Sequence, residues 1–207
     1  MNLTLFAAPG SCSRVALTAL AAAGLPCTLA WVDLAGGQQR QPVYLALNPK
    51  GKVPLLDTPE GTLSDNLAIA TWVDAQAPAA GVLPAAGFAR AEAMGWLGWA
   101  AGTLHPLVYR LRMSARIHPD AATHEAIRAA ARAELQAALG AAEAVLADGR
   151  DWLGGARWSL ADTYVAWAIG RAQLSGVELT ALPRLTAFMA RHDALPAWRQ
   201  ALAQEPA

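Results

Sequence analysis

The sequence predicts an α/β first half followed by an all-helical second half. Short strand-like and helix-like segments alternate over roughly the first eighty residues, which is typical of an α/β unit. After the stretch 77–84, rich in proline and alanine, apolar residues recur at helical spacing. We therefore predict a first domain at residues 1–78, a linker at 79–85 and an all-α domain at 86–207.

The first domain is predicted to have the element order βαβαββα. Apolar runs, helical spacing and turn residues define its elements, and Gly24 is the expected C-cap of the first helix. In chain order, these elements are a strand at 3–7, a helix at 14–23, a strand at 27–32, a helical turn at 43–47, a hairpin formed by strand 53–57 and a brief strand after the turn 59–62, and a helix from 65 to about 77.

The second domain is predicted from helical periodicity and from one local capping signal. The sequence Ser159-Leu160-Ala161-Asp162 has the form of a capping box, so a helix is expected to begin there. The expected helices span about 88–113, 121–146, 159–174, 183–191 and 196–204.

Composition excludes several classes of function. Lysine plus arginine and aspartate plus glutamate each number 16, so no net charge attracts nucleic acid or an anionic membrane. Cys12 and Cys27 fit neither a disulfide framework nor a zinc site, and the 4 histidines lack metal-ligand spacing. The N-terminus lacks a signal-peptide pattern, and no apolar run is long enough to cross a membrane. We therefore expect a soluble cytoplasmic protein that needs no metal.

Cys12 is the first candidate for chemistry. It lies in the loop Pro9-Gly10-Ser11-Cys12-Ser13, between the first strand and the first helix. Free backbone N–H groups and the helix dipole at such a position favour a thiolate and lower a cysteine pKa. The alternative is a small loop residue beside a helix cap at Ser11 or Ser13. The loop alone does not separate the two interpretations.

Two further segments carry polar or backbone groups suited to a ligand. Pro54 stands at the start of an otherwise buried strand, where a cis Val53–Pro54 bond would turn the Val53 backbone toward a ligand; a trans turn explains it equally well. Asp65 and Asn66 lie in the first turn of the third helix. They suit either an α-amino-acid group or simple helix capping.

The order of these features resembles the cytosolic glutathione S-transferases, and most of all the bacterial beta class. The resemblance runs with few gaps across essentially the whole chain. The similar segments are Pro9 to Ser13, Ala23 to Pro26 leading to Val32-Asp33-Leu34, Tyr44 to Pro54, Trp96 to His105, and Trp158 to Tyr164.

This resemblance implies the glutathione S-transferase fold with a thioredoxin-like first domain, a homodimer, and glutathione as co-substrate. It implies that Cys12 faces the glutathione sulfur, that Ser13 offers a neighbouring hydroxyl, and that His105 projects toward the active-site cleft. The implied glutathione contacts are Ser11, Lys52, Val53, Pro54, Asp65 and Asn66. The implied activity is conjugation of glutathione to small hydrophobic electrophiles, reduction of glutathione mixed disulfides through Cys12, or both.

Some positions depart from the family pattern. Asp65-Asn66 stand where the family usually has Glu-Ser, and Gly98 replaces an asparagine that often reaches the partner subunit's glutathione. Pro106 replaces a frequent lysine, and Arg171 replaces a tryptophan that borders the second-substrate pocket. The electrophile is therefore left open.

Two alternatives follow from the same residues. The segment Ser11 to Val15 resembles the zeta-class maleylacetoacetate isomerases if one residue is deleted, although the ungapped run from Cys12 to Asp33 favours the beta class. A non-catalytic binding or regulatory protein with this fold, similar to the stringent-starvation adaptors, is the second alternative.

Overall fold

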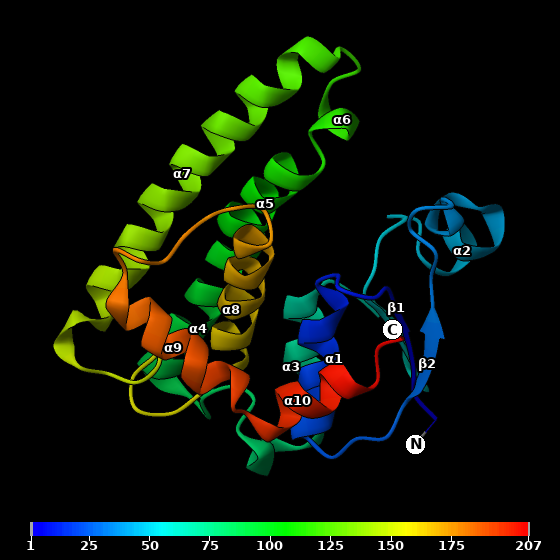
Figure 1. Ribbon diagram of the computed structural model, residues 1–207. Helices are drawn as coiled ribbons and strands as arrows, with labels where there is room; N and C mark the ends of the chain where they lie inside the picture. Colours follow the sequence, from blue (N-terminus) through cyan, green and yellow to red (C-terminus); the bar gives the residue numbers. More distant parts are fainter. Residues whose placement is uncertain (1, 207) are drawn as a thin grey trace. The chain divides into compact units, whose positions relative to one another are not determined.

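One mixed sheet organises the first part of the chain in the computed structural model, which describes residues 2–206 (Figure 1). Its strands are β1 (Thr4–Ala7), β2 (Thr28–Trp31), β3 (Leu55–Thr58) and β4 (Gly61–Ser64), in the spatial order β2-β1-β3-β4. β1 pairs in parallel with β2 and antiparallel with β3, and β3 and β4 form the predicted hairpin. The parallel pair needs a crossover connection, which contains helix α1 (Ser13–Ala22).

Different helices cover the two faces of this sheet. Successive residues of a strand point to opposite faces. In β1, Leu5 is fully buried, whereas Phe6 packs edge-on against Tyr44 of α2 (Pro42–Leu47), with ring centroids 6.0 Å apart. α1 and α3 (Asn66–Gln76) lie on the face opposite α2 (Figure 1). The predicted order βαβαββα is confirmed.

Local signals placed most element ends correctly. Gly24 has the positive φ of 63° expected after a helix, and Leu25 N–H donates to Leu20 O over 3.0 Å to close α1. β3 begins at Leu55, two residues later than predicted, because Pro54 has no N–H to donate to the sheet. The Val53–Pro54 bond is cis, one of the two conformations that the sequence left open.

Residues 86–193 form a separate helical unit. Its helices are α4 (Gly87–Trp99), α5 (His105–Arg112), α6 (Ser114–Ile117), α7 (His124–Val145), α8 (Leu160–Gln173) and α9 (Pro183–Asp193). Every residue of α8 from Leu160 to Ile169 is buried, so α8 is the core of this unit. α8 begins at the predicted capping box, in which Ser159 N–H donates to Asp162 Oδ2 over 2.8 Å. Within residues 2–206, no helix is both long and apolar enough to span a membrane.

The predicted helix 88–113 is interrupted by a π-helical stretch at Ala100–Leu104. Pro106 follows it within the first turn of α5. A proline inside a helix removes one backbone N–H and crowds the carbonyl four residues earlier. The wider π turn accommodates this loss. Shorter 3-10 turns occupy Gln38–Arg40, Pro78–Ala80, Ala121–Thr123 and Leu146–Asp148.

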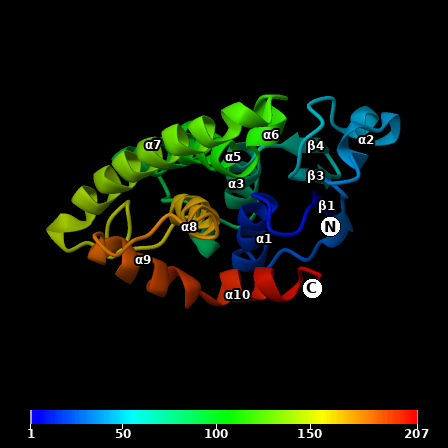
Figure 2. The ribbon, with the colours of Figure 1, turned by 45° about the horizontal axis from the view of Figure 1, so that its top comes forward.

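The C-terminal helix α10 (Pro196–Ala203) belongs to the first unit, which differs from the predicted domain 86–207. α10 lies along α1 (Figure 2), where Trp198 and Ala201 are buried. The predicted linker 79–85 also differs, because Val82 and Leu83 are buried and Leu83 N–H donates to Asp74 Oδ1 over 3.3 Å. Helical periodicity identified α10 but carried no information about its packing partner.

Candidate active site

The loop that follows β1 is organised by Ser11. Ser11 Oγ donates to the Ala8 carbonyl oxygen over 2.8 Å, lies 2.8 Å from Ser13 Oγ, and accepts a hydrogen bond from Ser13 N–H over 3.2 Å. Ser11 therefore satisfies an N–H group at the start of α1, as helix-capping serines do. Ser13 is fully buried, whereas Ser11 is partly exposed. Of the two serines, only Ser11 keeps part of its surface exposed.

Cys12 occupies the N-cap position of α1 and is buried. Its thiol donates to the Val53 carbonyl oxygen over 3.6 Å. Burial raises the pKa of the Cys12 thiol to about 12, and this outweighs the lowering by its backbone hydrogen bond and by Lys52. The lowered pKa predicted from the helix N-terminus is therefore wrong, because the thiol faces the packed interior rather than water.

The segment that carries Val53 is held by two side chains, one from α2 and one from the residue that follows α2. Tyr44 Oη and Asn48 Nδ2 both donate to the Lys52 carbonyl oxygen, over 2.8 and 2.7 Å. Val53 and Pro54 are buried, whereas the Lys52 side chain is exposed. We did not predict a role for Tyr44 or Asn48. Their spacing of four residues places them on one face of a helix, which is the signal that could have identified them.

At the start of α3, the two predicted residues point in different directions. Asp65 has a positive φ of 75°, is exposed, and forms an ion pair with Lys50 over 2.7 Å. Asn66 is buried, and its Nδ2 donates to the Cys12 carbonyl oxygen over 3.1 Å. Its Oδ1 is buried, and the residues 2–206 offer it no hydrogen-bond partner. The Asn66 amide is thus directed to Cys12. The exposed partner of Asp65 is Lys50, a residue for which the sequence predicted no role.

The structure therefore brings three of the predicted residues into direct contact. Cys12 bonds to Val53 through its thiol and to Asn66 through its carbonyl group. The exposed groups around them are the Lys52 and Asp65 side chains, and Ser11 is partly exposed. The buried residues Cys12, Val53 and Asn66 hold the site together, and the exposed side chains are the ones that a ligand can reach.

His105 belongs to the helical unit, where it is the first residue of α5. Its Nδ1 lies 2.8 Å from the Tyr164 hydroxyl oxygen of α8. Its ring packs edge-on against Trp167, with centroids 4.7 Å apart. These contacts hold the imidazole in one orientation. The bond between Nδ1 and the Tyr164 hydroxyl group sets the tautomer, and therefore whether Nε2 donates or accepts.

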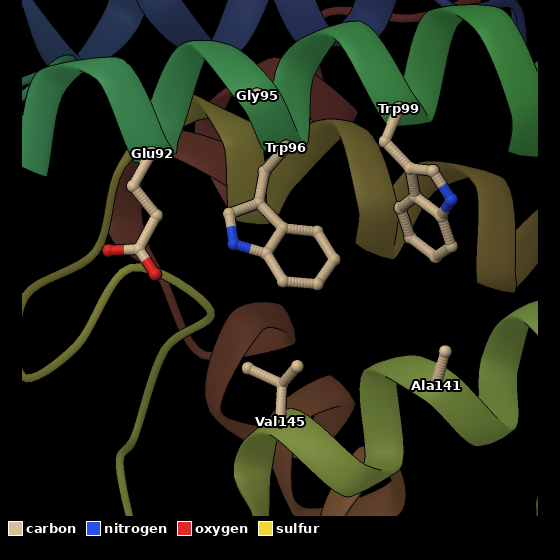
Figure 3. A pocket seen from close by; sticks show the side chains of 6 residues that line it. All are labelled: Glu92, Gly95, Trp96, Trp99, Ala141 and Val145. Carbon is tan, nitrogen blue, oxygen red and sulfur yellow. The ribbon is translucent and has the colours of Figure 1, made fainter.

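The helical unit also carries a shallow groove that no sequence motif indicated (Figure 3). Trp96 and Trp99 extend from α4 toward α7, with their rings 5.3 Å apart and nearly perpendicular. The groove has a volume of about 420 Å³ and is lined by Glu92, Gly95, Trp96, Trp99, Ala141 and Val145. It is mainly apolar, and its carboxylate lies 3.6 Å from Arg150. Among residues 2–206, no cluster of three or more histidine, cysteine or acidic side chains is placed to hold a metal ion.

Comparison with known proteins decides the family. A family model described as the N-terminal domain of glutathione S-transferase matches residues 5–81, and one described as its C-terminal domain matches residues 125–203. Glutathione S-transferase GST-4.5 of Xanthomonas campestris is 34% identical over 91% of this chain and 92% of its own length. The chain belongs to the glutathione S-transferase family.

Solved structures of glutathione S-transferases agree with this assignment. A glutathione transferase homologue from Sulfitobacter, solved with bound glutathione, superimposes with a TM-score of 0.89 at 29% identity, over 98% of this chain and 97% of that one. A beta-class glutathione S-transferase of Sphingomonas chungbukensis gives a TM-score of 0.84 at 29% identity, with 97% of each chain covered. The resemblance to the beta class is confirmed.

The relatives of this chain also include an isomerase. The maleylacetoacetate isomerase of Pseudomonas aeruginosa is 32% identical over 80% of this chain and 78% of its own length. This glutathione S-transferase therefore has relatives that carry out two different reactions.

Proposed function

We propose that this glutathione S-transferase conjugates glutathione to small apolar electrophiles, with glutathione bound along the first unit. The observation that carries the proposal is the convergence of the Cys12 loop, the Val53 backbone and the start of α3 at one place. Each is a backbone or side-chain group suited to a peptide ligand. The glutathione-bound homologue of the same fold supports this choice of ligand.

Charges at the start of α3 suit the γ-glutamyl end of glutathione. This end carries both an ammonium group and a carboxylate. Asp65 offers an exposed carboxylate, and Lys50 offers an exposed ammonium group 2.7 Å from it. The N-terminus of α3, an 11-residue helix, adds backbone N–H groups that favour an anion. In this proposal Asp65 binds the ammonium group, whereas Asn66 orients the Cys12 carbonyl.

The chemistry requires a thiolate on glutathione. The glutathione thiol gives its proton to solvent water, its sulfur attacks the electrophilic carbon, and the leaving group departs with the electron pair of the bond that breaks. Ser11 is the partly exposed serine of the loop, so we assign its hydroxyl to the thiolate; its hydrogen would turn from the Ala8 carbonyl oxygen to the sulfur. Ser13 and Cys12 are buried. Disulfide reduction through Cys12 is the less supported activity, because it needs an ionised thiol and burial raises the pKa of Cys12 to about 12.

His105 and the dimer complete the proposal. We retain His105 as a candidate catalytic residue carried by the helical unit, supported by its fixed orientation against Tyr164. We also propose a homodimer in a reducing, cytoplasmic compartment. Exposed apolar side chains such as Phe88 and Val43 support association, and the unpaired Cys12 and Cys27 support the compartment. Light scattering on the purified protein tests the dimer.

Calorimetric titration with glutathione, followed by conjugation assays with a chlorodinitrobenzene, tests this function. We expect binding at about millimolar glutathione or below. We expect Ser11→Ala to lower kcat/KM by about 100-fold, the usual effect of removing one stabilising donor. Cys12→Ala should conjugate at close to the wild-type rate. The absence of binding at such concentrations contradicts the proposal, and binding without turnover of any electrophile supports a non-catalytic protein.

Glutathione-dependent isomerisation is a second candidate, because the Pseudomonas relative is a maleylacetoacetate isomerase. There the glutathione sulfur would add to a carbon–carbon double bond, the resulting single bond would rotate, and the sulfur would leave again. Glutathione is then regenerated rather than consumed. Measuring thiol consumption with a cis-dienoic acid substrate separates the two reactions.

A further inference from the structure

A single carboxylate connects the Cys12 loop to the C-terminal segment. Glu205 Oε2 accepts a hydrogen bond from Gly10 N–H over 2.8 Å. Arg14 donates to the same carboxylate twice, from Nε to Oε1 over 2.7 Å and from Nη2 to Oε2 over 2.6 Å. Gly10 and Arg14 lie two residues before and two residues after Cys12. The Glu205 carboxylate therefore fixes both sides of the loop that carries the thiol.

This arrangement is shielded from water. The side chains of Arg14 and Glu205 are 17% and 10% exposed, compared with 58% and 63% for the Lys50–Asp65 pair. The guanidinium group of Arg14 also lies over the Trp198 ring, 5.2 Å from its centroid. A bidentate arginine–carboxylate pair with little exposure contributes more to stability than a solvent-exposed ion pair.

The fold delivers Glu205 to this position through α10. α10 lies along α1 (Figure 2), with Trp198 and Ala201 buried, and the chain continues from its end to Glu205. Gly10 has a positive φ of 66°, which turns the loop so that its N–H meets the carboxylate. The loop and the C-terminal segment belong to one compact unit.

We propose that Glu205 is a positioning residue of the glutathione site, holding residues 10–14 so that the Cys12 thiol stays buried and Ser11 keeps its place in the loop. This inference rests on the proposed function for its effect on catalysis. Its effect on the loop does not depend on glutathione. Without the carboxylate, Gly10 N–H and the Arg14 fork lose their common acceptor, and the loop is free to open.

The test uses the full chain in a Cys27→Ser background, so that Cys12 is the one thiol measured. Glu205→Ala is compared with Gln204→Ala, which changes an exposed side chain at the adjacent position. Alkylation of Cys12 by iodoacetamide is followed by mass spectrometry from pH 7 to 10, without glutathione and well below the unfolding temperature. The kcat and KM for conjugation are measured in parallel.

We expect Glu205→Ala to be alkylated about tenfold faster than Gln204→Ala, with a lower apparent pKa of Cys12, because loop opening exposes the thiol. We expect kcat to fall about tenfold while the KM for glutathione changes much less, because Ser11 is displaced from the reacting sulfur. Glu205→Gln keeps one acceptor oxygen and should lie between the two.

Unchanged alkylation and an unchanged pH profile in Glu205→Ala, with only a lower melting temperature, would overturn the inference and leave Glu205 as a structural contact. Arg14→Lys keeps the positive charge but cannot donate two parallel hydrogen bonds to Glu205. If Glu205→Ala does not fold, the alkylation rate and kcat of Arg14→Lys are therefore compared with those of Gln204→Ala. An inactive wild-type enzyme would contradict the proposed function, whereas the alkylation rates would still report on Glu205.

Discussion

Asn66 donates its side-chain amide to the Cys12 carbonyl oxygen over 3.1 Å, which joins the first residue of α3 to the N-cap residue of α1. The two residues are 54 positions apart in the chain. The two helix starts that frame the proposed glutathione site are therefore coupled by one buried hydrogen bond.

Replacing Asn66 by Ala should weaken this coupling. We expect the free energy of unfolding to fall by about 1–2 kcal/mol, since one buried hydrogen bond and its packing are lost. Urea unfolding measures the change, with Gln76→Ala at the exposed end of α3 as the control. Equal stabilities of the two variants would show that the bond contributes nothing measurable. Asn66→Ser, the residue more usual in the family, should recover part of the loss.

Cys12 should make stability fall at alkaline pH. Burial raises its pKa from 9.0 to about 12, so above pH 9 the unfolded thiol ionises while the folded one keeps its proton. The unfolded state then binds fewer protons, and the stabilising contribution of Cys12 is lost as the pH rises from 9 toward 12. Between pH 9 and 10 this contributes about 1 kcal/mol.

The measurement is the difference in unfolding free energy between the wild type and Cys12→Ala at pH 8, 9 and 10. We expect this difference to shrink with pH. Cys27 and Tyr44 also have raised pKa values from burial, but they are common to both proteins and cancel in the comparison. A constant difference would mean that the thiol is not shielded.

Among the helix caps of the helical unit, we expect substitution of Asp162 to lower the free energy of unfolding most. Its carboxylate accepts hydrogen bonds from Leu153 N–H and Ser159 N–H, each over 2.8 Å. Burial raises the pKa of Asp162 to about 6, so it is ionised at neutral pH, where it accepts both bonds. Asp162→Asn turns an amide N–H₂ toward these donors, and we expect a loss of about 2–3 kcal/mol. Glu134→Ala, on the exposed side of α7, is the thermal-unfolding control and should change the melting temperature little.

His192 should make the enzyme sensitive to mild acid. It is fully buried between Thr163, 3.3 Å from Nε2, and Asp193, 3.4 Å from Nδ1. Burial lowers its pKa below the ordinary 6.5, and Asp193 raises it by less. Below pH 6.5 the unfolded histidine takes up a proton that the folded one excludes, so stability falls as the pH falls, by up to about 1.4 kcal/mol per pH unit.

The slope of unfolding free energy against pH, from 7 to 5, checks this prediction. Asp162, whose pKa is raised to about 6, titrates in the same range but is common to both proteins, so the stability of the wild type relative to His192→Gln should fall as the pH falls, whereas its stability relative to His118→Gln, at an exposed position, should change little. Parallel slopes for the wild type and His192→Gln would contradict the assignment.

The local features of this fold were readable from the sequence because their causes lie within a few residues. Gly24 ends a helix through its own φ, and Ser159 and Asp162 cap each other across one turn. The element order of the first unit follows from alternating apolar runs. The family resemblance then identified Cys12, Val53 and Asn66 as parts of one site, although it did not show how they are connected.

Other properties depend on contacts between distant residues. The protonation state of Cys12 was predicted wrongly because a helix N-terminus is a local signal, whereas burial comes from the packing of the whole unit. The grouping of α10 with the first unit was missed for the same reason: periodicity identifies α10 as a helix but does not identify α1 as its partner.

The sequence by itself determined most of the elements, the family and most of the residues of the proposed glutathione site. Only the tertiary structure decided that Cys12 is shielded, that Asn66 faces Cys12, and that Glu205 reaches Gly10 from 195 positions away. Helix and strand signals are short-range, whereas burial and pairing at such separations exist only once the chain has packed.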